Sequence, residues 1–153
     1  MTAEISPKTT AAQRRQNIRE TAEALGINDA YISVLIDTFY DRVRAHPILG
    51  PIFDDAIGDQ WDNHLPIIKT FWVSFIFGDG SYTRDMGAVH KNLTKVRPEH
   101  FAIWLELFRA TLQETAPKPE AIEFFMIRAE RVAQGLQTIM YGRRDVFGQK
   151  SKH

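Results

Sequence analysis

The chain has 153 residues, a length typical of one domain with a single hydrophobic core. Its 19 lysines and arginines balance its 19 aspartates and glutamates, so no net charge draws the molecule toward nucleic acid or anionic lipid. The absence of cysteine excludes disulfides, thiolate metal sites and cysteine nucleophiles, so any protein ligand to a metal would be a histidine, aspartate or glutamate.

Apolar residues recur at helical spacing in every long segment, so we predict an all-α fold with no strand. Residues 13–25 are highly charged and predict a peripheral helix within a lead-in of residues 1–28. Asn28 or Asp29 can cap the next helix, predicted at 29–45, by accepting hydrogen bonds from its first N–H groups. Its apolar face consists of Ile32, Leu35, Ile36, Phe39, Tyr40 and Val43.

The next stretch, up to residue 58, contains glycines and prolines and predicts a corner, with Phe53 as an apolar plug. Residues 59–77 carry aromatic and aliphatic side chains at steps of three and four, which indicates a helix. Pro66 lies inside this helix and is expected either to delay its start until about residue 63 or to bend it, since proline lacks the backbone N–H.

Glycines and a later proline leave room for only a short helix at 84–93, which carries His90. A strong helix at 98–115 follows, with proline at its tolerated first position. The last helix is predicted at 119–142, and the basic tail at 143–153 is expected to be frayed and flexible.

Most catalytic signatures need spacings that this chain lacks, including phosphate loops, nucleophile elbows and paired Glu-x-x-His turns. Two histidines, His64 and His90, lie on apolar faces of aromatic segments. These faces suit either an ordinary core or a slot for a flat apolar cofactor such as haem, whose iron needs one axial histidine. The walls of such a slot would be Phe53, Ile68, Phe71, Trp72, Trp104 and Phe108.

Four stretches carry a resemblance: FYDRVRAHPILGPIFDDAI at 39–57, WDNHLPIIKTFW at 61–72, the segment from Tyr82 to His90, and HFAIWLELFRATL at 100–112. In this order and spacing they resemble the truncated haemoglobins, most closely group III of that family. The similarity extends over residues 30–142 or so. It implies a globin-like, truncated two-over-two helical sandwich around haem b, with the globin domain at 29–142.

The resemblance also implies roles for individual residues. His90 matches the proximal histidine that binds iron, while Tyr40 and Trp104 match the residues that face the bound ligand. His64 matches a distal position, from which it would gate the pocket, bind the iron opposite His90, or remain in solvent. The positions that match the haem-packing residues of the family are Phe53, Ile68, Phe71 and Trp72.

Haem propionates need cations or hydroxyl groups near the rim of their pocket. The candidates that flank the proximal segment are Tyr82, Lys91, Lys95 and Arg97. The chain departs from the family's motif Tyr-x-Gly-x-Pro-x-x-x-His, because Arg84 and Met86 occupy the glycine and proline positions.

The expected function is to bind O2, CO, NO and cyanide, with high O2 affinity because Tyr40 and Trp104 donate hydrogen bonds to the ligand. Such retention suits ligand sensing, NO dioxygenase chemistry or peroxidase-like activity with an unknown reductase, rather than bulk O2 delivery. The competing hypothesis is a cofactor-free helical interaction or sensory module.

Neither nucleic acid nor a membrane is expected as a partner. The basic tail, with Arg143, Arg144, Lys150 and Lys152, does not make a continuous basic face for nucleic acid. No apolar run has the length of a secretion signal or a membrane span, which favours a cytoplasmic protein with no membrane partner.

Overall fold

The computed structural model describes residues 10–84, 90, 93 and 95–142, and each regular element within them is an α-helix. The prediction of an all-α fold is confirmed. The predicted helix at 84–93 and the tail at 143–153 lie wholly or mostly outside the described residues. The helices are α1 (Ala11–Ala24), α2 (Asp29–Ala45), α3 (Leu49–Ile57), α4 (Trp61–Phe77), α6 (Pro98–Thr115) and α7 (Pro119–Tyr141).

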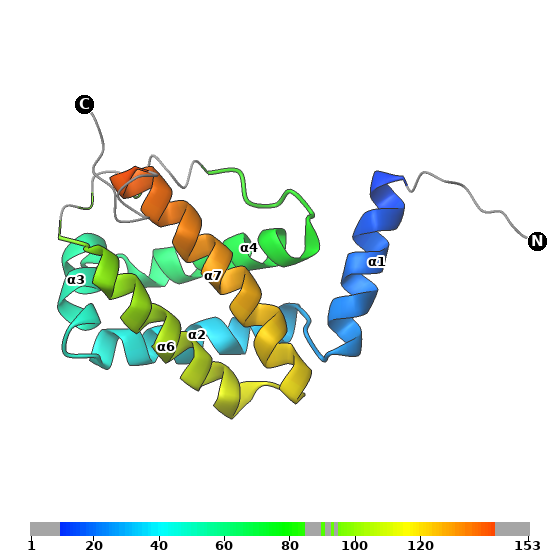
Figure 1. Ribbon diagram of the computed structural model, residues 1–153, viewed down its shortest axis with the longest axis horizontal. Helices are drawn as coiled ribbons and strands as arrows, with labels where there is room; N and C mark the ends of the chain where they lie inside the picture. The colour runs from blue at the N-terminus through cyan, green and yellow to red at the C-terminus, as the bar shows by residue number, and fades with distance from the viewer. Residues whose placement is uncertain (1–9, 85–89, 91–92, 94, 143–153) are drawn as a thin grey trace, which may run out of the picture.

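Four of these helices form two layers. Figure 1 shows α6 and α7 crossing in front of α2 and α4, and the two helices of each layer run in opposite directions. The short α3 closes one end of the sandwich, whereas α1 stands at the other end. This arrangement is the predicted globin-like, two-over-two sandwich. None of the helices in the described part of the chain has the length and apolarity needed to cross a membrane.

The lead-in helix α1 is attached to the sandwich through α4. Its first turn is closed reciprocally, because Thr10 Oγ1 accepts a bond from the Gln13 N–H and Gln13 Oε1 accepts one from the Thr10 N–H. Further along, the guanidinium of Arg19 lies 4.0 Å from the ring centroid of Phe77 at the end of α4. A cation over an aromatic ring therefore links the two helices.

Helix α2 supplies one side of the core. Asn28 is its N-cap, with Oδ1 accepting a 2.8 Å hydrogen bond from the Tyr31 N–H, so Asn28 and not Asp29 satisfies the first turn. Every residue of its predicted apolar face is buried. Helical periodicity identifies this buried face correctly because α2 packs against α3, α4 and α6.

The expected corner after α2 is wrong, because residues Leu49–Ile57 form the helix α3. Its first turn is satisfied by a side chain outside the helix: His46 Nδ1 accepts hydrogen bonds from the N–H groups of Ile48 and Leu49, at 3.1 and 3.2 Å. Pro51 lies in the first turn, where no backbone donor is needed. The helix is too short for periodicity to reveal it.

Helix α4 begins at Trp61 with Pro66 inside it, so a start delayed to residue 63 is also wrong. The proline deprives only the Asp62 carbonyl of a helical donor, and Asp62 is exposed to water. Gly78 ends the helix with φ of 67°, a left-handed conformation that favours glycine.

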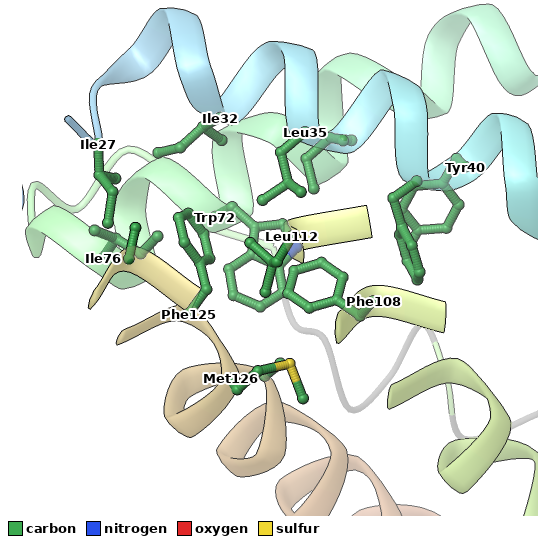
Figure 2. Packing of buried hydrophobic residues seen from close by; sticks show 14 of the residues in the cluster. Ile27, Ile32, Leu35, Tyr40, Trp72, Ile76, Phe108, Leu112, Phe125 and Met126 are labelled. Carbon is green, nitrogen blue, oxygen red and sulfur yellow. The ribbon is translucent and has the colours of Figure 1, made fainter. Parts of the chain in front are cut away.

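Stacked aromatic rings hold the two layers together. Phe108 on α6 stacks on Trp72 on α4, with centroids 5.4 Å apart and planes 17° apart, and Phe125 on α7 packs against both. Figure 2 shows aliphatic side chains of α2 above these rings and Met126 below them. Tyr40 lies at one end of the cluster, far from Ile27 and Ile76 at the other. Tyr40 thus lies at one end of the part of the core that Figure 2 draws.

Candidate functional site

A hollow opens at the Tyr40 end of the core. It has two lobes of about 200 Å³ each, lined in common by one residue from each of α2, α3, α4, α6 and α7 and by His90. We treat the lobes as one slot because they share these residues. The shared residues are Tyr40, Phe53, His64, His90, Trp104 and Leu136.

The rest of the lining is mostly apolar. The lobe next to α3, here the α3 lobe, is further lined by Leu49, Ile52, Ala56, Ile57, Leu93, Val96, His100, Phe101 and Met140. The lobe next to α4, here the α4 lobe, is further lined by Ile67, Ile68, Phe71, Trp72, Tyr82, Arg84 and Val132. A narrow, aromatic and aliphatic slot with a few polar groups is typical of a site for a large flat apolar molecule.

Tyr40 and Trp104 form a hydrogen-bonded pair on the slot. Burial raises the pKa of Tyr40 to about 12, and a hydrogen bond with the Trp104 side chain opposes this rise. An indole can only donate, so Trp104 gives its N–H to the Tyr40 oxygen, and the proton of Tyr40 stays available for a ligand. Phe39 holds both rings edge-on, with centroid distances of 4.8 Å to Tyr40 and 5.5 Å to Trp104.

Phe108 lies behind this pair and does not line the slot. It is fully buried, and its ring stacks on Trp104 with centroids 5.5 Å apart and planes 9° apart. The sequence predicts Phe108 as a wall residue of the slot because it lies one helical turn from Trp104, on the same face of the helix. In the structure it supports the wall instead.

Both predicted histidines line the slot. His64 lies in the first turns of α4, and His90 belongs to the segment that connects α4 to α6. Burial, and then the positive charges of His90 and Arg84, lower the pKa of His64, which favours its neutral imidazole. A neutral imidazole can both accept and donate a hydrogen bond.

The predicted rim residues are distributed differently. Tyr82 lines the α4 lobe, with its ring edge-on to Phe71 at 5.2 Å. Lys95 and Arg97 do not line either lobe: Lys95 pairs with Asp55 at 3.1 Å, and Arg97 precedes α6. Lys91 lies outside the described residues.

Several lining residues were not selected from the sequence. Those from α3 were missed because α3 itself was missed, whereas Leu136 lies on α7, a helix that the sequence predicts. His100 lines the α3 lobe, and its Nδ1 accepts a 3.0 Å hydrogen bond from the Arg97 N–H. Arg84 was noted only as a departure from the family motif, yet it lines the α4 lobe.

The donor set of the slot fits haem. The described residues contain no group of three or more histidine, cysteine or acidic side chains that could hold a bare metal ion. Haem iron takes four ligands from the porphyrin and needs only one imidazole from the protein. The slot offers that imidazole on His90, together with aromatic walls for the ring and an arginine for its carboxylates.

Known proteins with related sequences and structures support this interpretation. The chain is 34% identical over 118 residues to the group 3 truncated hemoglobin ctb of Campylobacter jejuni, covering 75% of this chain and 92% of the relative. It is 28% identical over 125 residues to the group 2 truncated hemoglobin YjbI of Bacillus subtilis, covering 78% and 89% respectively. No protein-family model matches the chain.

The structural comparison agrees. The crystal structure of the group III truncated hemoglobin from Campylobacter jejuni matches with a TM-score of 0.69 and 34% identity, over 75% of this chain and 92% of that one. The fold and the slot therefore define an all-α, globin-like protein. The chain belongs to the truncated haemoglobins, in group III. Membership in this family implies a globin-type haem protein that binds gaseous ligands.

Proposed function

We propose that the slot binds haem b with His90 as the proximal ligand and that the protein takes up O2, CO, NO and cyanide. The observation that supports this best is the lining itself, where one imidazole and the Tyr40–Trp104 pair share an otherwise apolar slot. Haem would supply a ferrous iron that binds a diatomic gas and shifts electron density onto O2 more than onto CO.

Tyr40 would stabilise the O2 ligand by donating its O–H. A hydrogen bond to a charged group contributes about 1.5–3 kcal/mol, and the surrounding burial keeps water from competing for the donor. The Trp104 N–H, by donating to Tyr40, polarises that hydroxyl and makes it a stronger donor. The pair would therefore slow O2 escape far more than CO escape.

High O2 retention favours sensing or redox chemistry over delivery. We propose that the protein acts as a ligand sensor or, supplied with electrons by a reductase, in NO dioxygenation or peroxide turnover. The imidazole of His64, which lines both lobes of the slot, would serve as a gate that contacts an entering ligand. We assign these roles to the domain at 29–142 and treat residues 1–28 as a lead-in outside it.

Haem reconstitution of the full chain tests the proposal. The wild-type protein should acquire a Soret band, and His90→Ala should lose stable haem while keeping its helical circular dichroism. His46→Asn is the matched control, since His46 contacts the backbone of α3 and not the slot. A wild-type protein that folds fully and stays colourless with added haem would instead support the cofactor-free interaction module.

A further inference from the structure

Arg84 is the only lysine or arginine among the described residues that line the slot. It belongs to the α4 lobe, whereas no lysine, arginine, aspartate or glutamate of the described residues lines the α3 lobe. The slot therefore has one electropositive end and one apolar end.

The Arg84 end also borders a groove on the outer surface. Ile67, Tyr82 and Arg84 line both the α4 lobe and a groove of about 230 Å³ on the outer surface, which also has hydroxyl groups from Thr70, Ser81 and Thr83. These three residues form a thin wall between the slot and water. A charged group reaching this wall would keep part of its hydration, which lowers the cost of its burial.

Two other cations considered from the sequence, Lys95 and Arg97, are among the described residues, and neither lines the slot. Lys95 has 67% of its side chain exposed and forms an ion pair with Asp55 on α3. Arg97 is exposed and does not line the slot. By contrast, no carboxylate of the described residues lies within ion-pair distance of Arg84. Among the described residues, therefore, no carboxylate competes with an added anion for this guanidinium.

We propose that Arg84 binds a propionate carboxylate of haem, so that the propionate edge of the cofactor lies at the wall formed by Ile67, Tyr82 and Arg84. This assignment rests on the proposed function and adds the orientation of the cofactor to it. The vinyl-bearing edge then enters the apolar α3 lobe, where a carboxylate would be desolvated without a cation. The guanidinium offers two parallel N–H groups that match a carboxylate.

The rate of haem loss tests the proposed ion pair between Arg84 and a haem propionate. Full-length wild-type protein, Arg84→Gln and Arg84→Lys are each loaded with haem b or with haem dimethyl ester, which lacks the carboxylates. Transfer of the porphyrin to an excess of a haem-scavenging apoprotein is followed at the Soret band. Lys95→Gln is the matched control, because it removes a cation of the same region that does not line the slot.

We expect Arg84→Gln to lose haem b about three- to tenfold faster than the wild type, as for a partly exposed charge-assisted pair. Arg84→Lys should recover part of this difference, and high salt should reduce it. With the dimethyl ester the wild type and Arg84→Gln should lose porphyrin at equal rates, and Lys95→Gln should match the wild type with both porphyrins.

Two results would overturn the assignment while leaving the proposed function intact. One is an equal haem b loss rate for the wild type and Arg84→Gln. The other is the same acceleration in Arg84→Gln with both porphyrins, which would show that Arg84 acts through packing. A wild-type chain that takes up neither porphyrin would refute the proposed function itself, and this assignment with it.

Discussion

Trp104 donates its indole N–H to the hydroxyl of Tyr40, so the two polar side chains act in series. The sequence comparison implied two separate donors facing the ligand. With Trp104 directed at Tyr40, we expect Tyr40 to be the terminal donor to a ligand and Trp104 to polarise it. This relationship changes the expected outcome of mutating either residue.

A double-mutant cycle on O2 dissociation measures this coupling. Tyr40→Phe should raise the O2 dissociation rate by about ten- to a hundredfold, because it removes a hydrogen bond to a partly charged ligand. Trp104→Phe should have a smaller effect, and the double variant should resemble Tyr40→Phe alone. Stopped-flow ligand replacement gives the rates, with CO as the control whose dissociation barely changes. Fully additive effects on O2 would show that both residues donate independently.

The buried tyrosine also predicts a loss of stability at alkaline pH. Folding raises the pKa of Tyr40 from 10.0 to about 12, so between these values the folded chain keeps a proton that the unfolded chain has released. The free energy of unfolding should therefore fall as pH rises from about 10 to 12, by ~2 to 3 kcal/mol from this residue. Urea unfolding of the wild type and Tyr40→Phe over this range isolates the contribution. A constant difference between the two proteins would contradict it.

Phe108, the ring behind the slot, should matter more for stability than Phe75, a more exposed ring on α4. Phe108→Ala removes a fully buried side chain stacked between Trp72 and Trp104 and should cost about 3–5 kcal/mol. Phe75→Ala removes a ring that is 39% exposed and should cost about 1 kcal/mol or less. Chemical denaturation measures both. Equal losses would show that the ring stack is not the centre of the core.

Replacement of glycine by alanine should lower the stability of the fold at Gly50 and raise it at Gly135. A Cβ at Gly50 would lie 2.5 Å from the Arg44 carbonyl oxygen, so Gly50→Ala should push α3 from α2 and destabilise the fold by about 1–3 kcal/mol. Gly135 lies inside α7 with no neighbour within 4 Å of an added Cβ, so Gly135→Ala should stabilise it by about 0.5–1 kcal/mol. Thermal unfolding of each variant reports the sign. A stabilising Gly50→Ala would contradict the close helix contact.

The helices predicted best from the sequence are those with a long apolar stripe. A start of α2 at Asn28 or Asp29 and its entire buried face follow from residue type and spacing, and the structure selects Asn28 as the cap. Helix α3 escaped prediction because it has only nine residues, includes a proline and is capped by His46 from outside. A histidine that precedes a helix and accepts hydrogen bonds from its first N–H groups leaves no familiar sequence pattern, since its role depends on where the chain turns.

The amino-acid sequence by itself determined the all-helical class, the faces that become core, and the residues whose types suit a haem slot. Tertiary structure decided which of those residues meet. It placed Phe108 behind the slot, paired Lys95 with Asp55 and brought Arg84 to the slot wall. Helical periodicity records which side of a helix avoids water, but it does not record which residues of separate helices share a cavity. That depends on how the helices cross, which is set by packing between side chains distant in the sequence.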